Sequence, residues 1–348
     1  MQMLSRLRGA SALREKLILL FGGLIAANMV SWLWAFAEFR DKPVLLGSAL
    51  LAYSLGLRHA VDADHIAAID NSTRKLMQEG QRPLAVGLFF SLGHSAIVVL
   101  MSVAVGFASA AITSRFEEFK ALGSVVSTSA SALFLFALAL FNMLVLASVW
   151  RSFKAVRRGE RLDEEDFDLL LNQRGFLSRL FRPVFAMVRK SWHLFPVGML
   201  FGLGFDTATE VALFGMSATQ AADSASFASL LVFPALFTAG MSLVDTADGA
   251  LMLGAYGWAF LKPIRKIYYN LTITAVSVLV ALAIGGVETL GMIGAGFDLR
   301  GPFWEGVVAL NANFGLLGYG IIGLFLGSWI VSAVIYRLKG FDRLEAEG

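Results

Sequence analysis

Long apolar segments determine what this chain can fold into, because most of its length is covered by runs of about 20 residues or more, which is what a helix needs to cross a bilayer. Inside a bilayer a helix satisfies its own backbone hydrogen bonds, whereas an open strand does not. The sequence therefore predicts an all-α polytopic membrane protein with about eight transmembrane helices. We place them at residues 17–37, 43–69, 84–112, 124–149, 194–217, 226–260, 268–293 and 312–336.

Composition agrees with this class and narrows the chemistry open to the chain. Hydrophobic residues make up 57% of it and charged residues 16%, against about 25% charged residues in soluble domains. The chain has no cysteine, so it offers neither a disulfide nor a thiolate ligand for a metal ion. A metal site in this protein must therefore use nitrogen and oxygen atoms.

Lysine and arginine residues are distributed unevenly between the two sides of the predicted spans. With a cytoplasmic N-terminus, 23 of them lie in cytoplasmic segments and 5 in outside segments. Such an excess marks the cytoplasmic side of a membrane protein, so both termini are expected there. This topology explains the net charge of +3 without a nucleic-acid partner. We expect residues 1–348 to form a single transmembrane domain, whose first apolar run is too long for a cleaved signal peptide and is retained.

One long cytoplasmic loop, residues 151–192, separates the fourth and fifth spans. Its second half places apolar residues at helical spacing opposite arginines. This pattern suits an amphipathic helix on the inner leaflet, and a plain linker is the alternative. The apolar positions are Phe176, Leu177, Leu180, Phe181, Val184 and Val188.

The segment RHAVDADHIAAID, Arg58–Asp70, places several charges within the second span. Each charge at bilayer depth costs at least about 2.5–3.5 kcal/mol, so this concentration indicates a function. On a regular helix, His59, Asp62 and His65 share one face of about 120°, while Asp64 points elsewhere unless the helix opens. Two imidazoles and a carboxylate can hold a divalent transition metal.

Other readings of this segment are a buried ion-pair cluster around Arg58 and a proton relay. A lone intramembrane histidine more often makes a hydrogen bond between helices than it binds a metal. Two histidines and two aspartates within seven residues favour the metal.

Polar groups recur in three further spans. The third contains His94; the fifth contains Asp206 and Glu210, four residues apart; the sixth contains Asp245 and Asp248. These carboxylates could pair with Arg58 or with the hydroxyl groups of neighbouring threonines. They outnumber the one arginine within the predicted spans, however, and an excess of buried negative charge requires protons or a metal cation. Several of these residues lie midway along their spans, so we expect them to converge on one intramembrane chamber.

A weak internal repeat relates spans 2–3 to spans 5–6. SLGLRHAVDADH followed by SLGHS is similar to GLGFDTATE followed by TAGMS, with Gly56 to Gly93 matching Gly204 to Gly240. The two halves would run in opposite directions, and inverted repeats of this kind place transporter sites at their interface. A chance match between glycine-rich segments is the alternative.

Four segments resemble the signatures of the nickel/cobalt transporter family (NiCoT), whose members are secondary permeases. These segments are RHAVDADHI at 58–66, SLGHS at 91–95, LGFDTATE at 203–210 and GMSLVDTADG at 240–249. The resemblance implies high-affinity uptake of Ni²⁺, Co²⁺ or both across a prokaryotic cytoplasmic membrane. It also implies a central role for Asp64, whereas helix geometry favours Asp62. A regular helix cannot easily use both, so we expect local unwinding here.

The expected transport mechanism has no resident cofactor, because the metal ion is the cargo. The expected ligands are His59, Asp62, Asp64, His65 and His94, and the expected path or proton-coupling residues are Asp206, Glu210, Asp245, Asp248 and Arg58. The chain lacks a Walker motif, so ATP hydrolysis is not expected. Efflux is less favoured than uptake because His193 is the one histidine outside the signatures, whereas exporters tend to carry His-rich loops.

An intramembrane metalloenzyme is a rival hypothesis, but it would need an HExxH-type helix that the sequence lacks. A helical scaffold with buried ion pairs is a third. All-nitrogen and oxygen ligands suit Ni²⁺, Co²⁺ and Zn²⁺ alike, and both proton coupling and uniport stay open. So does the oligomeric state, since the pairs Gly198/Gly202 and Gly323/Gly327 could pack helices within or between subunits.

Overall fold

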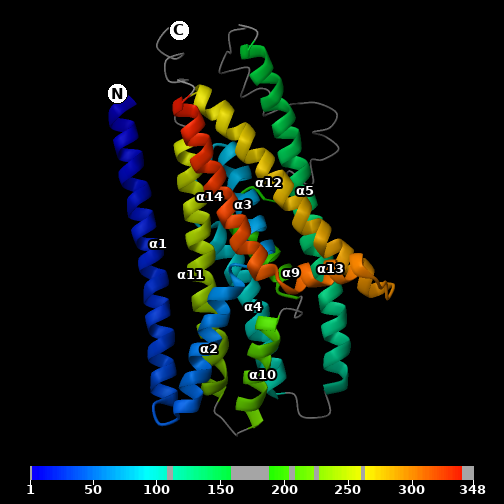
Figure 1. The fold of residues 1–348 in the computed structure, drawn as a ribbon. Coiled ribbons are helices and arrows are strands. Elements are labelled where there is room, and N and C mark those ends of the chain that lie inside the picture. Colours follow the sequence, from blue (N-terminus) through cyan, green and yellow to red (C-terminus); the bar gives the residue numbers. More distant parts are fainter. Residues whose placement is uncertain are drawn as a thin grey trace. The chain divides into compact units, whose positions relative to one another are not determined.

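The computed structural model describes residues 2–107, 113–157, 188–203, 208–222, 227–259 and 263–338. Within these ranges the regular elements are all helices, which confirms the predicted all-α class; Figure 1 traces them along the chain. They are α1 (Gln2–Phe39), α2 (Pro43–His59), α3 (Ala63–Gln78), α4 (Val86–Phe107), α5 (Thr113–Arg157), the 3₁₀ turn η1 (Ser191–His193), α9 (Leu194–Phe201), α10 (Ala208–Ala222), α11 (Phe227–Ala259), α12 (Pro263–Gly296), α13 (Pro302–Ala312) and α14 (Phe314–Leu338).

Five of the described helices are long and apolar enough to cross a membrane, and up to seven spans result if two interrupted helix pairs each count as one. The chain is therefore a multi-pass membrane protein. The predicted fifth span, 194–217, falls on α9 and α10, with residues 204–207 between them outside the described part. The count of eight stays a prediction. The five spans are Leu13–Phe39, Val86–Ala104, Ser124–Leu144, Ala228–Ala255 and Thr274–Gly296; the interrupted pairs are α2 with α3 and α13 with α14.

The second predicted span is not one regular helix. Helix α2 ends at His59 and α3 begins at Ala63, with Asp62 in an extended conformation before the new helix. The prediction that His59, Asp62 and His65 share one helical face is therefore wrong, because the helix axis is interrupted between them. The expected unwinding is confirmed. Helix α3 also continues to Gln78, well past the predicted end of the span at residue 69.

The chain divides into two compact units, which we describe separately. Unit 1 consists of residues 1–60, 87–126 and 195–247, and unit 2 of residues 61–86, 127–194 and 248–348. The core of unit 1 is apolar and is centred on buried aromatic side chains of α1 and α11. Phe39 stacks on Phe233 with ring centroids 5.5 Å apart, and Phe237 is fully buried beside them.

At two helix crossings of unit 1, the helices approach at glycines that each follow an aromatic residue by three positions. In the first crossing, Gly56 of α2 lies against the backbone carbonyl of Phe237 on α11. In return, a Cβ atom on Gly240 of α11 would lie 2.9 Å from the carbonyl oxygen of Tyr53 on α2. Small residues allow such close approach of helices in a membrane. We call this the α2/α11 crossing.

The same arrangement occurs between α4 and α9. Gly93 of α4 lies against the carbonyl of Phe195, and Gly198 of α9 lies against the carbonyl of Phe90. Span 2 thus pairs with span 6, and span 3 with span 5, as an inverted repeat of spans 2–3 and 5–6 requires. The crossings match Gly56 with Gly198. The sequence comparison matched Gly56 with Gly204, six residues later. The repeat itself stays a prediction.

Gly198 and Gly202, one of the two predicted GxxxG pairs, therefore pack within unit 1, because Gly202 lies against the backbone of His94. Gly323 and Gly327 on α14 have open space around them.

In unit 2, helix α3 packs against α12 and α14 and carries buried charge. Arg74 donates hydrogen bonds to the hydroxyl groups of Thr274 (3.1 Å) and Ser277 (2.6 Å) on α12. Ser277 in turn donates to a carboxylate oxygen of Asp70 at 2.7 Å. Asp70 and Arg74 are almost completely buried, so this network neutralises a carboxylate and a guanidinium that would otherwise be costly in an apolar interior.

We expect Gly56→Ala and Gly93→Ala each to destabilise the protein by about 1–3 kcal/mol, the usual cost of overpacking a tight interior. Each added methyl group would overlap a backbone carbonyl that cannot rotate away. Thermal unfolding of the detergent-solubilised chain measures the effect.

The matched controls are Gly22→Ala and Gly23→Ala on α1, where an added Cβ atom meets nothing within 4 Å. These should be neutral or slightly stabilising, because alanine is the better helix former. Equal unfolding temperatures for both pairs would contradict the crossings.

Replacing Arg74 by methionine should cost about 3–5 kcal/mol, because it leaves the Asp70 carboxylate buried without its cation. Thermal unfolding again provides the measurement, with the exposed Arg40→Gln as the control. Adding Asp70→Asn to the Arg74 variant should recover part of the loss. A single variant as stable as the control would show that the network contributes nothing.

Candidate metal site

Two histidines of unit 1 lie close in sequence to the glycines of the crossings. His59 is the last residue of α2, one turn after Gly56, and His94 comes one residue after Gly93 on α4. Both side chains are buried. Their Nε2 atoms lie 3.0 Å apart and their ring centroids 4.7 Å apart. The two imidazoles are therefore held together in the buried interior of unit 1.

The first turn of α10 adds two oxygen-bearing side chains to this pair. A carboxylate oxygen of Glu210 lies 3.0 Å from Nε2 of His94, and Oγ1 of Thr209 lies 3.1 Å from Nδ1 of His59. Glu210 and Thr209 are buried as well. Helix α10 packs against α2, which brings this turn to the histidines. We call these four side chains, His59, His94, Thr209 and Glu210, the imidazole–carboxylate cluster.

The number of hydrogen atoms available to the ring nitrogens of the cluster favours a cation between them. Nε2 of His94 lies within hydrogen-bonding distance of both the His59 ring nitrogen and the Glu210 oxygen. One ring nitrogen carries either one hydrogen or one lone pair, so it cannot serve both neighbours well. A divalent cation can accept lone pairs from both imidazoles and the carboxylate together. Nitrogen and oxygen donors of this kind suit Ni²⁺, Co²⁺ and Zn²⁺.

Thr209 lies where its hydroxyl group can select the tautomer of His59. If Nδ1 donates its hydrogen to the threonine hydroxyl oxygen, then Nε2 is the lone-pair nitrogen and points toward His94. Partners of this type orient metal-binding histidines in proteins. The ring of Phe237 packs against His59 with centroids 5.5 Å apart and limits its rotation.

The other predicted residues of the second-span motif belong to unit 2. Asp62 precedes α3 at its N-terminus and is buried, Asp64 lies in the first turn and is half-buried, and His65 is fully buried. Asp248 of α11 is also buried in this unit. All four side chains are at least half-buried.

The structure places the other predicted residues in different environments. Asp245 on α11 is fully buried in unit 1, where Gly87 of α4 lies against its backbone carbonyl. Arg58 is exposed, and the arginine that makes a buried ion-pair network is Arg74. An ion-pair cluster centred on Arg58 is therefore not supported. Asp206, like residues 158–187 of the predicted amphipathic loop, lies outside the described residues.

Sequence reasoning missed Thr209 and the buried polar groups of unit 2. Among these, Asn142 donates to the side-chain oxygen of Asn71 at 2.7 Å, and Ser131 lies 2.8 and 2.9 Å from the two carboxylate oxygens of Glu288. A signal was present for Glu288, which interrupts an apolar run, but no spacing rule connects it to Ser131, 157 residues away.

A multi-pass helical chain with buried imidazole and carboxylate groups is typical of membrane proteins that bind metal ions. The family model described as high-affinity nickel-transport protein, NicO, matches residues 45–335, and the chain belongs to this family. It is thus a membrane transporter rather than an enzyme, and the resemblance seen in its four signatures is confirmed.

Curated relatives agree over nearly the full length. A high-affinity nickel transport protein of Cupriavidus necator is 58% identical over 340 residues, covering 98% of this chain and 97% of the relative. The nickel-transport protein NixA of Helicobacter pylori is 44% identical, covering 86% and 90%. The cobalt transport protein NhlF of Rhodococcus rhodochrous is 38% identical, covering 85% and 84%. No solved structure matches this chain.

Replacing Thr209 by valine should weaken Co²⁺ binding about 10–100-fold, because His59 loses the partner that fixes its tautomer. Calorimetric titration of the purified protein measures this. Thr209→Ser should bind nearly as the wild type does, since it keeps the hydroxyl group. Thr238→Val is the matched control, because that hydroxyl donates to a carbonyl of its own helix. Equal affinities for all variants would remove Thr209 from the site.

Proposed function

We propose that this chain carries Ni²⁺, Co²⁺ or both into a prokaryotic cell across the cytoplasmic membrane by secondary transport. The observation that supports this most directly is the convergence of His59, His94 and Glu210, with successive donor atoms 3.0 Å apart. The names of the relatives point to the same substrates. The metal ion is cargo, and the imidazole–carboxylate cluster is its proposed binding site.

His65, Asp62 and Asp64 are proposed as further ligands or as residues that orient the ligands. The chain brings them within six residues of His59, and the helix is interrupted between His59 and Ala63, so Asp64 is not bound by the regular helix that would point it away from Asp62. Asp206, Asp245 and Asp248 are proposed for the path or for proton coupling.

The membrane potential supports the inward direction. It supplies about 2.3 kcal/mol per charge for each 100 mV, and therefore about 4.6 kcal/mol for a divalent ion. Accumulation then needs neither ATP nor a counter-ion. Coupling to protons through the buried carboxylates is the second possibility, and a pH-sensitive dye inside vesicles distinguishes the two during uptake.

The central test is ⁶³Ni²⁺ uptake into proteoliposomes with an imposed inside-negative potential. His59→Ala, His94→Ala and Glu210→Gln should each reduce uptake by more than the roughly 10–100-fold expected when only an orienting partner is lost. His193→Ala is the matched control, since His193 lies in η1 outside the cluster. Uptake that survives all three substitutions would overturn the proposed site.

Substrate choice and direction are tested in the same vesicles. Excess Co²⁺ should compete with ⁶³Ni²⁺ uptake, whereas Mn²⁺, which binds nitrogen ligands more weakly, should compete poorly. Competition by Zn²⁺ and Cu²⁺ measures how far geometry restricts the site. Net release from metal-loaded cells, with no uptake, would favour the efflux alternative.

A further inference from the structure

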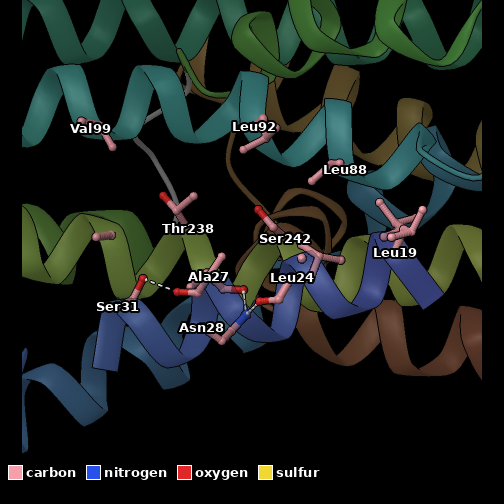
Figure 2. A pocket seen from close by; sticks show the side chains of 14 residues that line it. Leu19, Leu24, Ala27, Asn28, Ser31, Leu88, Leu92, Val99, Thr238 and Ser242 are labelled. Carbon is pink, nitrogen blue, oxygen red and sulfur yellow. Dashed lines mark hydrogen bonds between the residues drawn. The ribbon is translucent and has the colours of Figure 1, made fainter. Parts of the chain in front are cut away.

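Buried polar side chains outside the imidazole–carboxylate cluster differ in whether they can change charge. In the cavity of unit 1 between α1, α4 and α11, Figure 2 shows Asn28 and Ser31 hydrogen-bonded to backbone carbonyls of their own helix. These amide and hydroxyl groups stay neutral. Glu288 on α12 of unit 2 is 5% exposed, and its carboxyl group can gain or lose a proton. A buried ionisable group of this kind within a membrane span indicates a function.

Glu288 lies deep within its span and faces α5. It is eight residues from the nearer end of the span Thr274–Gly296, or about 12 Å at 1.5 Å per residue, in a hydrocarbon core roughly 30 Å thick. Figure 1 shows α12 crossing α5. Gly285 and Met292, three residues before and four residues after Glu288, lie on the same face of α12 and also meet α5. A Cβ atom on Gly285 would lie 3.3 Å from the ring of Phe136, and Met292 accepts a hydrogen bond from Ser129.

The contact between Glu288 and Ser131 of α5 fits a protonated carboxyl group. Oγ of Ser131 lies 2.8 Å from one carboxyl oxygen of Glu288 and 2.9 Å from the other. A hydroxyl group has one hydrogen, so it donates to only one of these oxygens in a straight hydrogen bond. A protonated carboxyl group supplies a second hydrogen: its O–H donates to Oγ of Ser131, while its carbonyl oxygen accepts from the serine. Both short distances are then hydrogen bonds.

The charged side chains of α3, which packs against α12, are engaged elsewhere. Arg74 donates to the hydroxyl group of Ser277 within the Asp70 network. Ser277 is eleven residues before Glu288 on α12, or about 16 Å along the helix. Lys75 forms an ion pair with a carboxylate oxygen of Glu79 at 2.7 Å.

The other elements around α12 bring few charges to this depth. Glu305 of α13 is exposed, and so is Tyr319 of α14. Residues 122–150 of α5, 314–336 of α14 and the remainder of α12 from 267 to 296 contain no Asp, Glu, His, Lys or Arg. The surroundings given by these helices therefore favour the neutral form of the carboxyl group.

We propose that Glu288 and Ser131 form a proton-binding site within the membrane, which uses none of the proposed metal ligands. The Glu288 carboxyl group carries a proton while α5 and α12 are in contact, and it releases the proton when the two helices separate. The O–H bond then breaks, the electron pair stays on the carboxylate, and the proton passes to water that enters the opened crossing.

The helix contacts of unit 2 connect this site to metal transport, a step that rests on the proposed function. Helix α3 carries His65 and Asp62, which are proposed as further ligands, and Arg74 of the same helix is hydrogen-bonded to Thr274 and Ser277 of α12. A movement of α3 during transport would therefore also displace α12 at its crossing with α5. The site would thus couple proton movement to metal movement.

Infrared spectroscopy of the full chain in phosphatidylcholine nanodiscs tests the proton directly, because only a protonated carboxyl group has an isolated C=O stretch. At neutral pH, Glu288→Gln should lose such a band from the wild-type spectrum. Ser131→Ala should keep the band but shift it to higher frequency, since the carbonyl loses its hydrogen-bond donor. An unchanged band in Glu288→Gln would show that Glu288 is ionised and would overturn the site.

Two matched controls accompany these variants. Glu305→Gln removes an exposed carboxyl group and should leave the band in place. Ser129→Ala removes a hydroxyl group of the same crossing that donates to Met292, and it should cause no shift. If Glu288→Gln fails to fold, Ser131→Ala decides: an unshifted band there would contradict the pair.

Proteoliposomes that contain a pH-sensitive dye test the coupling. Ni²⁺ uptake by the wild type under an imposed potential should be accompanied by a change of internal pH, and Glu288→Gln should lose this change while Glu305→Gln retains it. Wild-type uptake without a linked pH change would overturn the coupling and leave the proposed function intact. Absence of wild-type uptake would overturn the proposed function and the coupling with it, whereas the infrared result on the proton site would stand.

Discussion

The close contact of glycines with backbone carbonyls is the constraint on which unit 1 depends. Lipid tails are as apolar as the side chains they surround, so moving a side chain from lipid into a helix interface gains little free energy. Helices in a membrane are therefore held together by close packing and hydrogen bonds. Gly56 and Gly93 allow this packing, and each lies within one turn of a histidine. The crossings hold α2 against α11 and α4 against α9, so each histidine lies on a helix whose position its neighbouring glycine helps to set.

The two crossings use the same local pattern, an aromatic residue followed three positions later by glycine, on all four helices. The aromatic residue supplies the carbonyl against which the partner's glycine lies, and the rings of Phe90 and Phe237 are fully buried. The proposed metal site is less symmetric. Both imidazoles come from spans 2 and 3, whereas Glu210 and Thr209 come from α10 in the second half of the chain. Two crossings of the same pattern can thus support a site whose residues do not follow that pattern.

Polar groups have different tasks in the two units. In unit 1, one ring nitrogen of His94 faces both a second imidazole and a carboxylate, an arrangement that suits a cation that binds and leaves. In unit 2, Arg74 is matched by Asp70 and by the hydroxyl groups of α12, which suits a permanent structure. Charge burial alone does not distinguish these tasks. The balance of donors and acceptors around each group does.

The sequence by itself determined the helical membrane class, the family and most of the candidate ligands. Apolar length and the identity of side chains near His59 and His94 carry that information locally. The sequence also indicated unwinding after His59, because a regular helix could not use both Asp62 and Asp64. Only the tertiary structure paired Thr209 with His59, Glu210 with His94 and Ser131 with Glu288. Those partners are more than 100 residues apart, and their contact depends on which helices cross and at what register, which no local pattern specifies.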